Sequence, residues 1–289
     1  MPNDLAKTDL HMHSIVSDGT DAPKELLEQV KRAGLRIFSL TDHDAIRGCL
    51  EIQAKLGPGD PWFLPGVEFS CKDELGKYHI LGYGYDPESP SILDVVDMGH
   101  SYRIKKLRER LELLNTRFGI TFPERVVKEL LSLANPGKPH IGNMMVRFGY
   151  VKTKEEAFKR YLNQLRSPDD YVRPEEAIKG ILGAGGIPVL AHPCYGDGDQ
   201  LILGEELEKR VLRLMEFGLE GLEGLYSGFS EKLRDQVLTL AERHGLYVTA
   251  GSDYHGKNKL VRLGDTGYSE ALPIPEGWKR FLLVAFPSA

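Results

Sequence analysis

Short apolar stretches alternate with amphipathic stretches over most of the chain, and this alternation constrains the fold more than any other feature. Helical stretches of about 10–15 residues between strands are typical of parallel β/α units, in which each helix returns the chain to the same edge of the sheet. At least six such strands favour a closed barrel over an open sheet. We therefore predict an α/β barrel, with strands within residues 6–13, 35–44, 61–71, 77–85, 187–193, 219–226 and 246–255.

Residues 89–171 interrupt this rhythm with four consecutive helical segments and no strand between them. Longer barrel helices are an alternative explanation, but they fit a β/α barrel poorly because each barrel helix should lead into a strand. We predict that residues 1–88 and 172–289 form the barrel, which carries the functional site. Residues 89–171 would then be a helical insertion that acts as a substrate-binding lid.

Composition excludes several classes of protein. The net charge of -5 indicates no general attraction to nucleic acid, so a polyanionic ligand would have to meet a local positive site. The three cysteines include no CxxC pair, which favours a reducing compartment. Neither a signal peptide nor an apolar run of about 18 residues is present, so we expect a cytoplasmic protein without a membrane segment. The sequence implies no protein partner.

Histidines and acids gather where the predicted strands end. His11 and His13 are two residues apart on one strand, so their side chains share a face and can hold one ion. His79 is the exception, because it opens its strand; it reaches the same end only if that strand runs antiparallel. The carboxyl ends of barrel strands are where active sites form. The candidate metal ligands are His11, His13, Asp18, His43, Glu68, His79, His192, Asp253 and His255.

This ligand set predicts both the metals and the reaction. Imidazole and carboxylate ligands suit Zn, Mn or Fe, and the set is large enough for two or three divalent ions if Glu68 bridges. Cys194 follows His192 closely, and a small buried residue is the simpler interpretation of it than a thiolate ligand. The ions outweigh the charge of the three carboxylates, which favours an anionic substrate. Neighbouring metals activate water and stabilise attacking and leaving oxygens, so phosphoester hydrolysis is the expected reaction.

The chain resembles the PHP (polymerase and histidinol phosphatase) family in the motifs DLHMHSIVSDGT, SLTDHD, PGVEFS, HILGYG, VLAHP and GSDYHG, which span residues 8 to 256 in the family's order. The resemblance implies a distorted (β/α)7 barrel with a trinuclear metal centre. It implies one site of His11, His13, Glu68 and Asp253. It implies a second of Glu68, His79 and His192, and a third of Asp18, His43 and His255.

The insertion resembles that of PHP phosphoesterases that act on nucleoside 3',5'-bisphosphates, some of which also shorten RNA from its 5' end. GKPHIGNMMVRFGYV is similar to that branch's RPH stretch, with Lys138 in place of the usual arginine, whereas YVRPEEAI departs from the branch's pattern. The resemblance implies removal of a 3'-phosphate from a nucleotide or short oligonucleotide. Catalytic candidates are His192, His255 and Asp253, and candidate substrate contacts are Lys138, His140, Arg147 and Arg103.

Three points stay open at this stage. The cations at 103, 105, 106, 108 and 110 are more typical of a solvated helix face than of a binding site. Histidinol-phosphate phosphatase, or another small phosphomonoesterase, is the alternative enzyme, although that branch does not need a large lid. A binding module that has lost turnover is the third hypothesis, and loss of metal ligands would be its sign.

Overall fold

The computed structural model describes residues 4–133, 135–165, 170–196 and 200–287. Residues 1–3, 197–199 and 288–289 of the predicted barrel and residues 134 and 166–169 of the predicted insertion lie outside the described residues. The strands are β1 (Thr8–Asp9), β2 (Ile37–Phe38), β3 (Trp62–Phe63), β4 (Gly66–Asp73), β5 (Gly76–Tyr83), β6 (Ile187–Leu190), β7 (Gly221–Tyr226) and β8 (Tyr247–Gly251).

These strands form two sheets, in the orders β1-β2-β3 and β4-β5-β6-β7-β8. Leu10 N donates a hydrogen bond to Ala250 O, which joins β1 to β8. A bridge between His43 and Glu68 joins the segment after β2 to β4. Because β3 and β4 are separated only by Leu64 and Pro65, they act as one interrupted strand. The result is a distorted seven-stranded α/β barrel, as the sequence predicted.

The strand β5 runs antiparallel to its neighbours, and this explains how His79, near the start of its strand, reaches the other candidate ligands. It pairs antiparallel with both β4 and β6, and His79 lies opposite Ser70 in the register with β4. The beginning of β5 therefore lies at the same end of the barrel as the carboxyl end of β4. The antiparallel alternative for this strand is confirmed.

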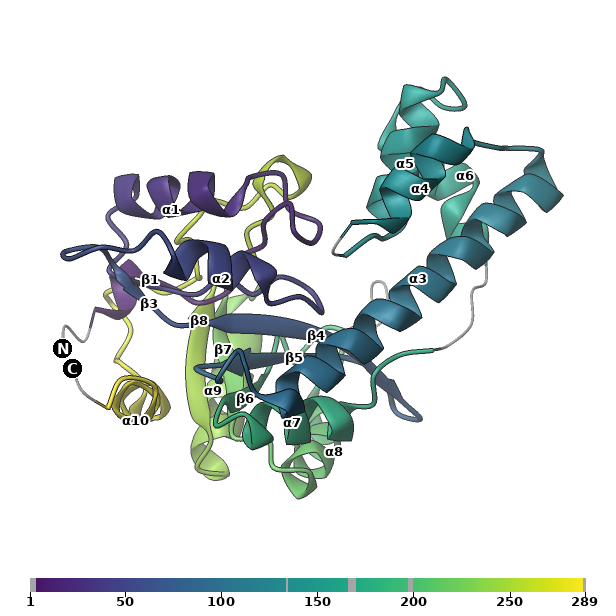
Figure 1. Cartoon of the computed structure of the whole chain (residues 1–289). Helices are drawn as coiled ribbons and strands as arrows, with labels where there is room; N and C mark the ends of the chain where they lie inside the picture. Colours follow the sequence, from purple (N-terminus) through teal and green to yellow (C-terminus); the bar gives the residue numbers. More distant parts are fainter. Residues whose placement is uncertain (1–3, 134, 166–169, 197–199, 288–289) are drawn as a thin grey trace.

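Helices surround the ring of strands and carry the insertion (Figure 1). Helix α1 begins at Pro23, whose ring suits the first helical turn, and the chain turns at Gly34 with a φ of 70°. The last helix, α10, was not expected from the sequence; its Trp278 and Phe281 are buried against the barrel. The helices are α1 (Pro23–Arg32), α2 (Arg47–Gln53), α3 (Pro90–Phe118), α4 (Glu124–Leu131), α5 (Lys138–Arg147), α6 (Lys154–Arg160), α7 (Pro174–Gly183), α8 (Gly204–Glu216), α9 (Glu231–Arg243) and α10 (Glu276–Ala285), with 3-10 turns at Leu5–Lys7, Leu162–Gln164 and Gly256–Asn258.

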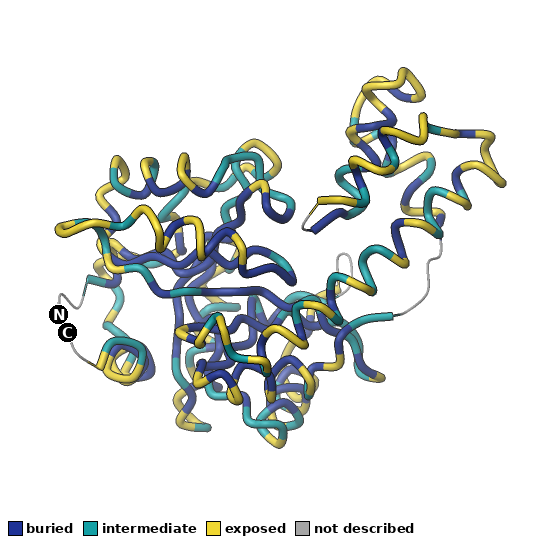
Figure 2. Tube along the Cα trace, viewed as in Figure 1, coloured by how far each residue is buried: buried dark blue, intermediate teal, exposed yellow. Residues whose placement is uncertain are grey.

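Helix α3 belongs to two apolar cores. Ile92 and Val95, near its start, are buried in the main core with the barrel strands. Leu107 and Leu114, further along, are buried in a separate core with residues of α4, α5 and α6. Helix α3 thus extends away from the barrel, and α4, α5 and α6 pack against its distant part (Figures 1 and 2). The division of the chain at residues 89 and 171 stays a prediction, to which this separate core lends support.

Among the residues that the structure describes, no helix combines the length and the apolar character needed to cross a membrane.

Candidate metal centre

The nine candidate ligands converge at one end of the barrel, although the chain separates the first from the last by most of its length. His11 and His13 follow β1, and His43 follows β2. Glu68 lies within β4 and His79 within β5. The remaining candidates lie beyond strand ends, at Asp18, His192, Asp253 and His255. The structure therefore brings together the whole predicted set.

Glu68 is the centre of this cluster. One carboxylate oxygen, Oε2, lies 3.2 Å from His11 Nε2 and 3.0 Å from His13 Nε2. The same oxygen lies 3.2 Å from His43 Nδ1. The other oxygen, Oε1, lies 2.8 Å from His79 Nδ1 and 3.3 Å from His192 Nε2. A carboxylate that meets five imidazoles through two oxygens is well placed to bridge cations.

The two aspartates close the cluster on its other side. Asp253 Oδ1 lies 3.6 Å from His11 Nε2, 3.4 Å from His13 Nε2 and 3.3 Å from His255 Nδ1. Asp18 Oδ1 lies 3.2 Å from His255 Nε2. Asp253 adopts a left-handed backbone conformation, with a φ of 57°, as does His192 with a φ of 28°. Strained backbone at such positions is typical of functional sites, where the fold holds a side chain in one orientation.

Ligand atoms close enough to share an ion form three overlapping groups. They are His13, Asp18, His43 and His255; His11, His13 and Asp253; and His43, Glu68 and His79. These groups differ in part from the three sites that the resemblance implies. His13 and His43 each join two groups, and His192 meets Glu68 and His79 by distance without belonging to a group. The assignment of ligands to individual ions stays a prediction.

Three buried atoms show that these residues fit cations. Asp18 Oδ1, His43 Nδ1 and Glu68 Oε2 are shielded from solvent and have no hydrogen-bond partner among the described residues. A buried polar atom without a partner costs free energy, and a bound cation removes that cost. His11 Nε2 and His13 Nε2 also face each other at 3.2 Å. All of these atoms belong to predicted ligands.

The pKa values of the candidate ligands also suit the binding of cations. Burial holds the pKa of His43 well below its usual range, which leaves a lone pair available. Burial raises the pKa of Glu68, but the surrounding imidazoles outweigh it and hold that pKa well below its usual range. Burial lowers the pKa of His13, but the nearby carboxylates of Asp253 and Glu68 raise it to about 9. Cations that bind here would displace such protons, so metal binding is coupled to pH.

Buried acids behind the cluster hold the ligands in place, and the sequence analysis missed them. Glu223 on β7 is fully buried; its Oε1 lies 2.9 Å from His11 Nδ1, and its Oε2 accepts from His192 N at 2.7 Å. Asp9 accepts hydrogen bonds from Ser252 N and Oγ, and Asp42 from Ser14 N and Oγ. The second of the two glutamates in the stretch LEGLEGLY, placed within a predicted strand, was the available signal for the first of these acids.

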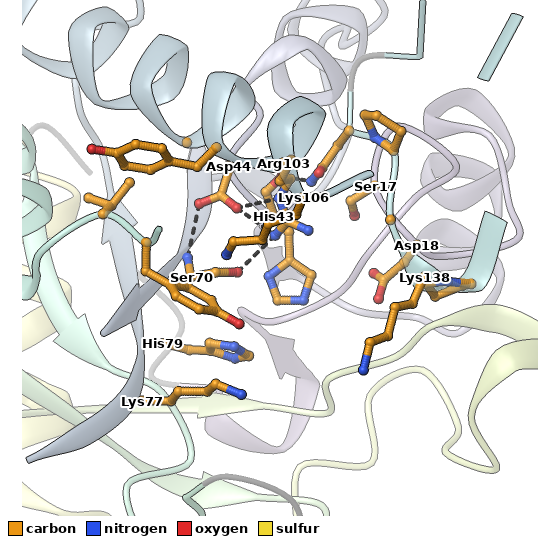
Figure 3. Close-up of a pocket in the computed structure, with 18 of the residues that line it drawn as sticks. Ser17, Asp18, His43, Asp44, Ser70, Lys77, His79, Arg103, Lys106 and Lys138 are labelled. Carbon is orange, nitrogen blue, oxygen red and sulfur yellow. Dashed lines mark hydrogen bonds and ion pairs between the residues drawn. The ribbon is translucent and has the colours of Figure 1, made fainter. Parts of the chain in front are cut away.

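A pocket of about 400 Å³ opens above the cluster (Figure 3). Its lining includes four candidate ligands: Asp18, His43, His79 and His192. The insertion adds to the same lining three cations of α3 that fall on one helix face, at positions i, i+3 and i+7. We call these cations the basic wall: Arg103, Lys106 and Arg110. This corrects the interpretation of the whole cationic cluster as a solvated face, which holds only for the exposed Lys105 and Arg108.

Of the four predicted substrate contacts, three line the pocket and one does not. Lys138 and His140 lie at the start of α5, and Arg103 lies on α3. Gly137 N donates to His140 Nδ1 at 3.2 Å, so the ring also caps its own helix. Arg147 is exposed at the far end of α5, outside the pocket lining, and its guanidinium lies 5.7 Å from the Phe148 ring centre. Burial raises the pKa of the Cys194 thiol to about 12, as expected for a small buried residue rather than a thiolate ligand.

Comparisons with known proteins agree with this site. A model of the PHP domain matches residues 9–169. A 3',5'-nucleoside bisphosphate phosphatase of Chromobacterium violaceum is 30% identical over 277 residues, covering 93% of each chain. A 5'-3' exoribonuclease of Haemophilus influenzae is 29% identical over 263 residues, covering 89% of this chain and 93% of that protein. A solved structure from Bifidobacterium adolescentis, assigned as a metal-dependent phosphoesterase, has a TM-score of 0.78 at 30% identity and covers 96% of each chain.

Fold, ligand cluster and relatives together define the class: the protein is a metal-dependent phosphoesterase. The chain belongs to the PHP domain family.

Proposed function

We propose that this protein hydrolyses the 3'-phosphate of nucleoside 3',5'-bisphosphates with the help of two or three divalent cations, among which Mn, Fe and Zn suit the ligands. The observation that carries the proposal is that one pocket lining combines candidate metal ligands with the basic wall. Such a lining suits a substrate with two phosphates, one for the cations and one for the basic wall. The volume also lies within the range of small-molecule sites.

In this proposal the two sets of lining residues have separate tasks. His11, His13, Asp18, His43, Glu68, His79, His192, Asp253 and His255 would hold the cations. When bound, these would activate a water molecule and stabilise the charge that develops on the phosphoryl oxygens. The basic wall would hold the 5'-phosphate and so place the 3'-phosphate at the cluster, and Lys138 and His140 would contact the substrate from the start of α5. The insertion, as a lid, would keep bulk water out.

Short RNA with a 5'-phosphate is a second candidate substrate. Its first phosphodiester occupies the same position relative to the 5'-phosphate as the 3'-phosphate of a nucleoside bisphosphate does. The same pocket lining therefore supports release of 5' nucleotides one at a time, in line with the name of the Haemophilus influenzae relative, a 5'-3' exoribonuclease.

The basic wall argues against the alternative of histidinol phosphate. That molecule has one phosphate, so with this phosphate at the metal cations, the side chains of Arg103, Lys106 and Arg110 would meet no second anion and would repel its amine. We place the protein in the cytoplasm, and we propose no protein partner.

Phosphate release tests the proposal. Purified protein loaded with Mn²⁺ is incubated with adenosine 3',5'-bisphosphate, a 5'-phosphorylated oligoribonucleotide and histidinol phosphate. We expect kcat/KM for the bisphosphate to exceed that for histidinol phosphate by about 100-fold or more, as two lost charge-assisted contacts imply. Equal or faster release from histidinol phosphate would refute the proposal.

A further inference from the structure

We propose that Asp44 is a positioning residue that fixes the guanidinium of Arg103 and thereby sets the place of the second phosphate relative to the metal centre. This inference rests on the proposed function. Asp44 directly follows the candidate ligand His43, and no motif of the sequence analysis gave it a role.

The contacts of Asp44 join α3 of the insertion to the barrel. Its Oδ2 accepts from Arg103 Nε at 2.6 Å and lies 2.5 Å from Arg103 Nη2. Its Oδ1 accepts from Ser70 N on β4 at 2.9 Å. Arg103 Nη2 also donates to Ser70 Oγ at 2.8 Å (Figure 3). Both nitrogens meet the single oxygen Oδ2, while Ser70 holds Oδ1 and Nη2, so this charge-assisted contact fixes the orientation of the guanidinium as well as its charge.

The backbone of Asp44 is tied to the metal centre. Asp44 N donates to Glu68 O at 2.9 Å, so the residue is fixed between the candidate ligands His43 and Glu68. Its φ of 46° lies in the left-handed region, which costs free energy for any residue except glycine. Its side chain is only 3% exposed. A shift of the metal centre would therefore be transmitted to Arg103, and a shift of Arg103 to the metal centre.

Gly99 makes this close approach possible. It lies one turn before Arg103 on α3 and lines the same pocket. A Cβ atom at position 99 would lie 3.0 Å from Asp44 Cβ and 3.1 Å from Asp44 Cγ, closer than nine in ten real Cβ contacts. The glycine thus lets α3 pack against Asp44 at the distance that the ion pair needs.

The anchored guanidinium has one remaining terminal nitrogen, Nη1, which lies 3.9 Å from the position that a Cβ atom would take on Gly137, another residue of the pocket lining. Arg103 is therefore held by Asp44 and Ser70 on the barrel side, and Nη1 is the nitrogen that we expect a bound phosphate to meet. An arginine without this anchor would sample other rotamers and lose affinity through their entropy.

A double-mutant cycle on metal-loaded protein tests the inference. The measurement is the Kd of adenosine 5'-monophosphate by calorimetry, which does not depend on turnover, together with bound metal by elemental analysis. Asp44→Asn keeps the acceptor for Ser70 N but removes the charge. We expect it to weaken binding about tenfold in the parent protein and less than about twofold in an Arg103→Met background, with bound metal unchanged.

Gly99→Ala is the second variant, because alanine favours a helix and leaves every charge in place. We expect it to weaken nucleotide binding about fivefold by displacing Asp44, and Arg108→Gln on the exposed face of α3 to leave binding within about twofold. Equal weakening by Asp44→Asn in both backgrounds, no weakening at all, or a loss of bound metal would overturn the inference. Failure of the proposed function is a separate result: no phosphate would be released from adenosine 3',5'-bisphosphate even where the cycle shows coupling.

Discussion

The metal centre and the basic wall lie in one pocket, yet their side chains come from very different stretches of chain. The metal centre gathers residues from 11 to 255, which lie on strands or in the segments that follow them, whereas the basic wall comes from three positions within two turns of α3. The first is buried in a network of acids and imidazoles that hold one another, with Glu68 only 1% exposed. The second is a concentration of like charges on one helix face.

The difference shows how each region is stabilised. Opposite charges surround Glu68, so its ionised form is favoured although it is buried. Lys106 is only 6% exposed, and its Nζ lies 3.0 Å from the Tyr171 ring centre, beside other cations. Burial, followed by the charges of Arg103 and Arg110, lowers the pKa of Lys106 to about 7. Like charges that lie close together and partly buried therefore destabilise the free protein, and a bound anion would offset this cost.

The largest effect is expected from Glu68→Gln, which removes the charge shared by five imidazoles. We expect kcat to fall by about 1,000-fold or more and bound metal to drop, since a neutral amide cannot bridge cations. Elemental analysis and phosphate release measure this. The exposed Glu88→Gln is the matched control, and full metal content in Glu68→Gln would contradict the view of a centre built around this carboxylate.

Glu223→Gln should have the next largest effect. Glu223 holds His11 Nδ1 and His192 N but lies behind both ligands. We expect metal affinity to fall about 10–100-fold, the usual cost of losing a partner that orients a ligand. Competition with a metal chelator gives the affinity. An unchanged affinity would mean that the barrel orients His11 without this acid.

Arg110→Gln and Arg108→Gln compare two faces of α3, because Arg110 lines the pocket and Arg108 is exposed to solvent. We expect the KM for adenosine 3',5'-bisphosphate to rise about tenfold in the first variant and to stay within about twofold in the second. Bound metal should be unchanged in both. Equal effects of the two variants would remove the distinction between the basic wall and the solvated face.

Lys106→Met should give the smallest effect, and the only one that is favourable. The pKa of Lys106 is about 7 in the folded protein. In the unfolded chain it is near the ordinary value of about 10.4, so between these values the unfolded chain binds more protons and stability rises with pH. The cost of this lysine is therefore complete below about pH 7 and relieved as pH rises toward 10.

Removal of Lys106 should accordingly raise the free energy of unfolding by about 1–2 kcal/mol at neutral pH and by little near pH 10. Urea unfolding at both pH values measures this, with Lys105→Met on the exposed side as the control. A loss of stability at neutral pH would show that the contact with Tyr171 outweighs the cost of burying the charge.

The sequence predicted the fold class and the metal centre because both depend on residue types with few other uses at those places. His11, His13 and His192 stand at strand ends, and the distance of i to i+2 on a strand decides which face they share. The sequence did not predict the roles of Glu223, Asp44 and the basic wall. Arginine, lysine and acids occur on most surfaces, and only their surroundings show whether they face water, a ligand or a histidine.

Residue types alone therefore predict the ligands of the metal centre and the closure of the strands into a barrel, because ligand type and hydrophobic periodicity are local properties. Packing of the folded chain sets which face of α3 meets the pocket, the contact of Arg103 with Asp44, and the position of Arg147 away from the site. The reason is physical: the direction of a helix face depends on how the helix packs, and α3 packs on the barrel at one end and on the insertion's own core at the other.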